Sequence, residues 1–122
     1  MDEVWTVDGA PVASGAVGET LRSRVQAGQR ETWLSSSAGR ALAFVTNTDR
    51  AMVMLLTAPG DAGEHAVDLA ATGSSDGFVL SNGQDDEYPD ADTVPLDEAL
   101  RIAAHIVAKG TWPPDARWVA DR

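Results

Sequence analysis

The sequence predicts an α+β fold, in which a mostly antiparallel sheet has an N-terminal and a C-terminal helix packed on one face. Three observations predict it. An amphipathic segment lies near each end of the chain, short apolar runs of strand length fill the middle, and turn residues separate those runs. The chain has 122 residues, of which 43% are hydrophobic and 23% charged, as in an ordinary globular protein. We therefore expect a single domain over residues 1–122.

The N-terminal part predicts a strand followed by a helix. Residues 3–7, EVWTV, suit a short strand or an ordered arm. A helix is expected from about Ser14 or Ala16 to Ala27, because apolar side chains recur there at every fourth position. These side chains are Val17, Leu21 and Val25. Gly28 then provides a C-terminal stop.

The middle of the chain predicts a series of strands. Runs of strand length occupy residues 32–36, 40–46, 51–56, 66–70 and 77–80. The run 51–56, AMVMLL, is apolar throughout, as in a buried central strand, and the NTDR turn before it allows a hairpin with 40–46. Asn82-Gly83 favours a second hairpin, whose return strand contains residues 87–88 and ends near Pro89.

The last helix is expected from about Pro95 to Lys109. Proline suits the first turn because the N–H that it lacks would have no partner within the helix. Asp97 and Glu98 lie in the same turn, where the helix dipole favours negative charge. One face is apolar and consists of Leu96, Ala99, Leu100, Ala103 and Val107. Gly110 ends the helix, and the tail beyond it is expected to pack back over the helix or the sheet edge through two tryptophans, Trp112 and Trp118.

The net charge of −10 is large for a chain of this length. Phosphate binding requires clustered lysine and arginine, and the nine basic residues are scattered, so neither nucleic acid nor a membrane is expected as a direct ligand. Two explanations of the acidity stay open: it serves solubility alone, or it steers a basic partner towards the protein. The chain has no cysteine, no basic signal sequence at its start and no apolar run of about 20 residues, so we expect a cytoplasmic protein.

The sequence contains no motif of a known catalytic or metal site. The patterns GxSxG and GxxxxGK and a dinucleotide fingerprint are all absent. His105 falls on the polar face of the last helix, and His65 opens a strand. Asp61, Glu64 and Asp68 lie near His65 in the sequence, but their spacing matches no zinc pattern. We expect no catalytic residues, no metal, no cofactor and no enzyme activity.

An acidic segment before the last helix is the candidate binding surface, with five carboxylates in eight residues. It does not match a calcium loop, because Asp90-Ala91-Asp92 lacks a following glycine and Pro95 interrupts it. A solvated loop, an acid–base carboxylate pair and a protein-binding surface all fit this composition. Tyr88 favours the last, since tyrosine is enriched at interfaces. The predicted partner-binding residues are Asp85, Asp86, Glu87, Tyr88, Asp90 and Asp92.

Several features of the chain occur together in a known family. The C-terminal ones are Val94-Pro95-Leu96-Asp97-Glu98-Ala99-Leu100, Lys109-Gly110-Thr111-Trp112-Pro113 and the final Trp118. Upstream of them are the apolar run 51–56 and the loop Gly60-Asp61-Ala62-Gly63. In this combination, over about residues 30–120, the chain resembles the bacterial polymorphic-toxin immunity proteins of family one.

The resemblance implies a cytosolic antidote that binds a toxin, often a nucleic-acid deaminase, and blocks its active site or substrate channel. Such a toxin needs a basic channel for its substrate, and an acidic protein can occupy that channel. The family has no fixed catalytic residues to transfer to this chain. The expected partner is therefore a basic cognate toxin, and the sequence sets no oligomeric state. A small-molecule-binding or enzymatic α+β domain and an acidic scaffold of a secretion system stay open as alternatives.

Overall fold

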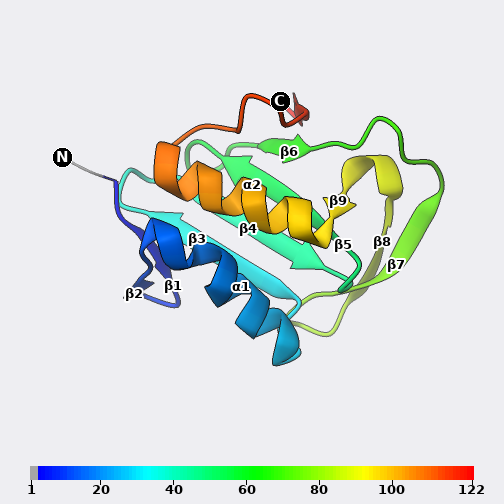
Figure 1. Ribbon diagram of the computed structural model, residues 1–122, viewed down its shortest axis with the longest axis horizontal. Helices are drawn as coiled ribbons and strands as arrows, with labels where there is room; N and C mark the ends of the chain where they lie inside the picture. Colours follow the sequence, from blue (N-terminus) through cyan, green and yellow to red (C-terminus); the bar gives the residue numbers. More distant parts are fainter. Residues whose placement is uncertain (1–2) are drawn as a thin grey trace.

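A mostly antiparallel sheet organises the fold in the computed structural model, which describes residues 3–122 (Figure 1). Within these residues the main sheet has the strand order β10-β6-β5-β4-β3-β1-β2, and β9 also pairs with β5. The bounds are β1 Trp5–Val7, β2 Ala10–Pro11, β3 Glu31–Ser36, β4 Ala41–Thr46, β5 Arg50–Leu56, β6 Glu64–Ala66, β9 Val94–Pro95 and β10 Trp118–Ala120. With two α-helices in addition, the predicted α+β class is confirmed.

The hairpin β4–β5 forms the centre of the sheet, as the sequence predicts. Six residue pairs align its strands, with Phe44 opposite Val53. Burial alternates along β5: Ala51, Val53 and Leu55 are buried, whereas the residues between them are only half-buried. Successive side chains of a strand point to opposite faces, so one face of β5 meets a complete core and the other does not.

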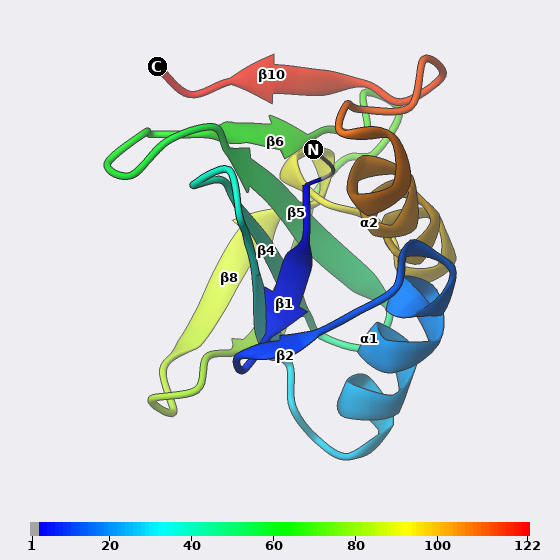
Figure 2. The same cartoon turned by 90° about the vertical axis from the view of Figure 1, so that its left-hand side faces the viewer.

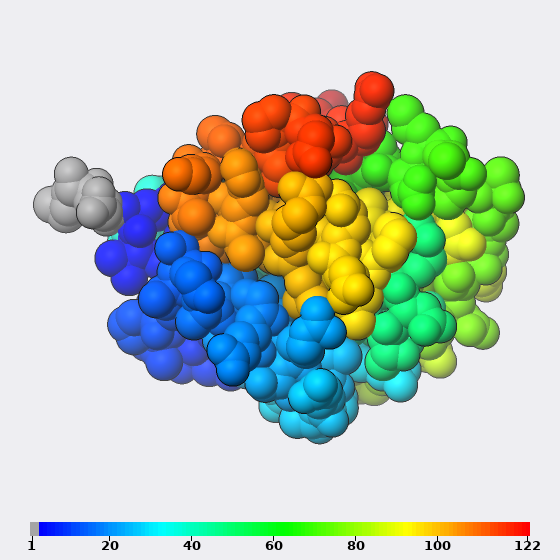
Figure 3. Space-filling view, viewed as in Figure 1, coloured from blue at the N-terminus to red at the C-terminus, as the bar shows by residue number. Residues whose placement is uncertain are grey.

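Both helices are close to the predicted positions. The first, α1, spans Val17–Gln26 after a 3-10 turn, η1, at Ser14–Ala16, and the second, α2, spans Leu96–Lys109. Figure 2 shows α1 and α2 on the same side of the sheet, and Figure 3 shows them side by side on the surface. Gly110 follows α2 in the left-handed region, with φ of 80°, and its N–H donates to the Ile106 carbonyl. Within residues 3–122 neither helix is long and apolar enough to cross a membrane.

The main core lies between the helices and the sheet. Its large members come from both layers: Trp5, Leu34, Leu42, Phe44, Val53 and Leu55 from strands, and Val17, Leu21, Leu100, Ile102 and Ile106 from helices. The apolar face predicted for α2 contributes Ala99, Leu100 and Ala103. These side chains are almost completely removed from water, and this burial is the dominant favourable contribution to folding.

A separate hairpin lies on the other side of the sheet. Its strands are β7, Ser74–Val79, and β8, Asp85–Pro89, and Figure 2 shows β8 across the sheet from the two helices. Ala43, Val45 and Phe78 are buried but lie outside the main core cluster. The hairpin therefore covers part of the second face and forms a small second core with it.

Three element boundaries differ clearly from the prediction. The strand expected at 77–80 is β7, which begins at Ser74 and ends at Val79. The strand expected at 66–70 is β6, Glu64–Ala66, and the residues after it turn away. Pro95 precedes the helix instead of lying in its first turn: it ends β9, where it pairs with Arg50. The N–H that proline lacks costs nothing in a two-residue edge strand either. The shifts at β6 and at Pro95 arise from strand pairing, which residue periodicity does not encode.

The C-terminal tail packs back on the sheet edge, as predicted. Its last strand, β10, pairs with β6, and the side chains of Trp118 and Trp112 stack with ring centroids 5.9 Å apart. Trp112 is 8% exposed and donates its indole N–H to Glu64 Oε1 at 2.9 Å. Trp118 remains 43% exposed. Trp112 is thus a structural residue, and Trp118 covers it.

Candidate partner-binding surface

The acidic segment forms strand β8 and a short 3-10 turn after it, η2, at Asp90–Asp92. The predicted hairpin turn precedes it: the Gly83 N–H donates to the Leu80 carbonyl, and Asn82 Oδ1 accepts the Gln84 N–H at 3.0 Å. Gly83 has φ of 89°, a backbone conformation that residues other than glycine rarely adopt. The turn holds the first carboxylates on an ordered strand rather than on a loop.

Alternation along β8 divides its side chains between two directions. Asp85 and Glu87 are exposed, whereas Asp86 and Tyr88 are half-buried. Asp85 accepts the Gly77 N–H at 3.0 Å, while Glu87 and Asp86 accept hydrogen bonds from side chains within the hairpin. Within residues 3–122 none of these three carboxylates has a cationic partner. Their negative charge is therefore not compensated within the described part of the chain.

The two aspartates of η2 have structural partners instead. Asp90 accepts the Ser75 hydroxyl at 2.6 Å, and its backbone carbonyl accepts Arg50 Nη2 at 3.2 Å. Asp92 Oδ1 lies 3.0 Å from His65 Nε2. The six predicted residues thus fall into three groups: two exposed carboxylates on β8, two half-buried side chains on β8, and two aspartates that fasten η2.

Two residues of β3, Glu31 and Trp33, which the sequence did not single out, are linked to the hairpin of this half-buried pair. Trp33, in β3, donates its indole N–H to Glu31 Oε2 at 3.1 Å, and Glu31 Oε1 accepts the Ser81 N–H at 2.9 Å. Burial raises the pKa of Tyr88, and the carboxylates of Asp86 and Glu31 raise it further. Glu31 thus connects Trp33 to the turn of the hairpin that carries Asp86 and Tyr88, and the Tyr88 hydroxyl donates to Asp86 Oδ2 at 3.2 Å. We call these four residues, Glu31, Trp33, Asp86 and Tyr88, the Trp33 patch.

Trp33 was recoverable from the sequence. In the run 32–36, Trp33 and Leu34 are both apolar, and neighbouring residues of a strand point to opposite faces. Leu34 is fully buried in the main core, whereas Trp33 is 46% exposed on the other face. Strict alternation would have singled out one of the two as exposed.

His65 joins two acidic residues that are distant in sequence. Its Nδ1 lies 2.8 Å from Asp121 Oδ2, and its Nε2 contacts Asp92. Burial lowers the pKa of His65, but the hydrogen bonds to Asp121 and Asp92 outweigh burial and raise it above the usual value. The histidine therefore links the C-terminal tail to η2.

The acidic residues near His65 in the sequence have other partners. Asp61 and Glu64 pair with Arg122, at 3.0 and 2.9 Å, and Asp68 pairs with Arg50 at 2.8 Å. The Thr57 backbone N–H and then Arg122 lower the pKa of the Asp61 carboxyl. In the described part of the chain, no group of three His, Asp or Glu side chains is arranged to hold a metal ion.

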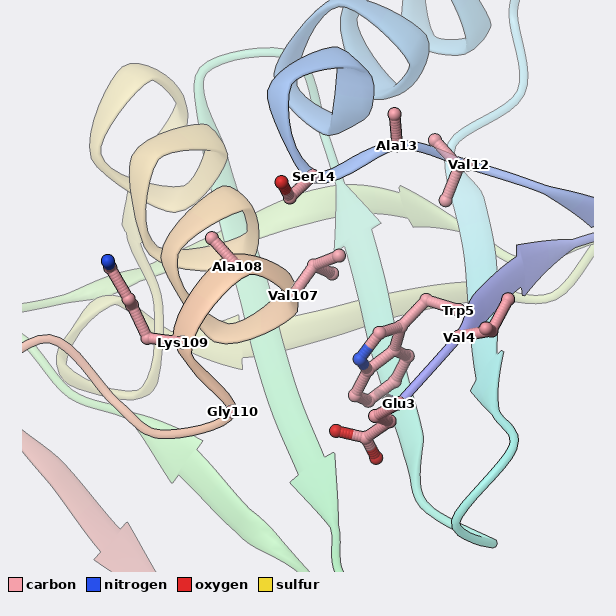
Figure 4. Close-up of a pocket in the computed structure, with 10 residues that line it drawn as sticks. All are labelled: Glu3, Val4, Trp5, Val12, Ala13, Ser14, Val107, Ala108, Lys109 and Gly110. Carbon is pink, nitrogen blue, oxygen red and sulfur yellow. The ribbon is translucent and has the colours of Figure 1, made fainter. Parts of the chain in front are cut away.

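A hollow of about 560 Å³ lies between β1, residues 12–14 and the end of α2 (Figure 4). Trp5 lines it, and its indole N–H forms no hydrogen bond with residues 3–122, but the nitrogen has almost no exposed surface. Of the two titratable residues in the lining, Glu3 is held by Arg40, whose Nε donates to Glu3 Oε2 at 2.9 Å, and Lys109 lies at the rim. The hollow thus lacks the converging free groups typical of a catalytic pocket.

No protein-family model matches this chain, and no curated protein matches it.

Proposed function

We propose that this protein is a cytoplasmic immunity protein that binds and neutralises a basic cognate toxin of the nucleic-acid deaminase type. The observation that carries the proposal is the charge on β8: Asp85, Asp86 and Glu87 are ordered, adjacent and without a cationic partner among residues 3–122. The resemblance of about residues 30–120 to toxin-immunity proteins supports the identity of the partner.

The geometry of the hairpin suits this task. Each of the three carboxylates accepts a hydrogen bond from a neutral group of its own hairpin, which limits the conformational entropy lost when a partner binds. A net charge of −10 raises the rate of encounter with a basic protein at low ionic strength. A deaminase binds a polyanion in a basic channel, so a rigid acidic strand can take the place of the substrate.

The first test is coexpression with the toxin encoded by the neighbouring gene. The two proteins are expected to copurify, and the toxin is expected to lose its deaminase activity. In the triple variant Asp85→Asn, Asp86→Asn, Glu87→Gln, we expect association at low salt to slow by about tenfold and its salt dependence to flatten. Stopped-flow or surface-binding kinetics at several salt concentrations measure both quantities.

A matched control removes the same charge elsewhere. Glu19→Gln, Asp97→Asn and Asp115→Asn also eliminate three exposed carboxylates, but these lie in α1, in α2 and in the tail. The control is expected to change association far less than the β8 variant. Equal effects from both variants would place the interface elsewhere, and a neighbouring toxin that is neither bound nor inhibited would refute the proposed function.

A further inference from the structure

A row of side chains crosses the sheet on the face opposite the helices. The strand register aligns Trp33 with Ala43, Ala43 with Met54, Met54 with His65 and His65 with Val119, across β3, β4, β5, β6 and β10. Directly paired residues of antiparallel strands share a face. Two apolar members of this row are large and exposed: Trp33 at 46% and Val119 at 43%. The β7–β8 hairpin therefore covers only part of this face, and Trp33 and Val119, at the two ends of the row, remain exposed.

Trp33 is fixed in place while much of its surface stays exposed. Its N–H is held by Glu31, and the other oxygen of Glu31 is bonded to the Ser81 backbone N–H at the hairpin. The Ser81 N–H and then the Trp33 indole lower the pKa of the Glu31 carboxyl, so the carboxylate is charged at neutral pH. An exposed aromatic ring that is already immobilised loses little entropy on binding, as is typical of interface anchors.

The charges of the patch define the partner. Glu31 and Asp86 are both acidic, and neither forms an ion pair within residues 3–122. A second copy of the chain does not fit this surface, because it would bring another net charge of −10 against these carboxylates. A guanidinium group fits: its flat face stacks on an indole, and its N–H groups donate to carboxylates.

We infer that the Trp33 patch is the contact point for an arginine side chain of a basic protein, with the guanidinium stacked on Trp33 and bonded to Glu31. The identification of that protein as the toxin rests on the proposed function. In the predicted interface only Asp86 and Tyr88 belong to this patch, and Asp90 and Asp92 lie outside it. The centre of the interface thus moves from the outer side of β8 to the open face of the sheet.

The inference can be tested without the toxin, on the full chain labelled with ¹⁵N. Hexa-arginine amide and hexa-lysine amide are titrated in separate samples, and the Trp33 indole N–H resonance is followed by NMR. We expect the arginine peptide to shift this resonance and to bind at least about threefold more tightly than the lysine peptide, because lysine offers no flat face for stacking. Equal affinities, or an unmoved Trp33 resonance, would contradict the inference.

Two variants and a matched control sharpen the result. Trp33→Val keeps a strand-forming residue and removes the ring, and we expect it to weaken arginine-peptide binding by about tenfold or more. Glu31→Gln retains the ring and removes one charge, so a smaller loss is expected. Trp118→Val is the control. Trp118, in β10, is exposed to a similar degree as Trp33, but its ring stacks on Trp112. Its binding should match that of the unchanged protein.

The outcomes separate this inference from the proposed function. If the toxin binds and Trp33→Val leaves its affinity unchanged, the patch is not the contact and the inference is wrong, while the immunity function stands. If the neighbouring toxin does not bind but the arginine peptide does, in a Trp33-dependent manner, the immunity function is wrong and the arginine site stands.

Discussion

The helix side and the hairpin side of the sheet are formed by the same strands, yet they differ in how completely their side chains are buried. On the helix side, Leu34, Phe44 and Val53 pack against α1 and α2 and are at most 1% exposed. On the hairpin side, Ala43 and Val45 are buried, but Trp33 is 46% exposed and its indole N–H is bonded to the Glu31 carboxylate. Complete burial of the helix side stabilises the fold. On the other side the β7–β8 hairpin buries only part of the sheet, and the exposed part leaves a surface for a partner. The following predictions test this difference.

The largest effect is expected in the main core. Phe44→Ala should lower the free energy of unfolding by about 3–5 kcal/mol, because it deletes a buried ring and leaves a cavity. Trp33→Ala, on the adjacent strand, should cost only about 1 kcal/mol, since much of the indole is already in water. Urea unfolding of both variants measures the two values. Equal losses would mean that the two faces are equally closed.

A medium effect is expected at the junction between the sheet and η2. Arg50 donates to the Thr93 hydroxyl at 2.7 Å and to Asp68 at 2.8 Å, and it reaches the carbonyls of Asp90 and Thr93. Arg50→Met should lower the free energy of unfolding by about 2–4 kcal/mol, because it leaves several partly buried acceptors without a donor. Amide hydrogen exchange should also speed up in residues 68–93.

The matched control for Arg50 is Arg30. Among residues 3–122 its side chain makes one hydrogen bond, from Nη1 to the Gly77 carbonyl at 2.9 Å. Arg30→Met should cost about 1 kcal/mol, the typical net contribution of one hydrogen bond. If both variants lose the same stability, the Arg50 network does not hold η2 to the sheet.

The smallest effect is a pH dependence at His65. Its pKa in the folded protein is raised above 6.5 by Asp121 and Asp92, so the folded state binds a proton more tightly than the unfolded state. The stabilisation is complete below about pH 6.5 and disappears as the pH rises through the higher pKa of the folded protein. Unfolding at pH 6 and pH 8 should show this decline in the unchanged protein.

His65→Asn is the control for that measurement, since it removes the titrating group and retains a polar side chain. The difference in stability between the unchanged protein and His65→Asn should shrink as the pH rises. A constant difference between pH 6 and pH 8 would mean that His65 does not exchange a proton in this range.

Local patterns in the sequence were sufficient for most elements. Apolar residues at every fourth position, Val17, Leu21 and Val25, predicted α1. The apolar face of the last helix predicted the ends of α2 to within one residue. The pair Asn82-Gly83 predicted the turn between β7 and β8. In each case the signal lies within a few neighbouring residues, where backbone preference and periodicity decide the structure.

The candidate site was only partly predictable. The acidic segment showed where uncompensated charge gathers, but it suggested one patch where the structure has three groups. Asp90 and Asp92 are fastened by Ser75 and His65, and neither contact has a signature in the sequence. Trp33 lies more than fifty residues before β8, so only the folded chain links it, through Glu31 and Ser81, to the hairpin that contains Tyr88.

The sequence by itself determined the α+β class, the two helices, the central hairpin and the strong negative charge, because these depend on composition and on short-range order. The tertiary structure decided which carboxylates are neutralised and which are not, since ion pairs such as Arg50 with Asp68 and Arg122 with Glu64 join distant segments. It also decided that the β7–β8 hairpin covers only part of the second face of the sheet. The register between strands that are distant in the sequence places Trp33 on that second face, where the side chain stays exposed.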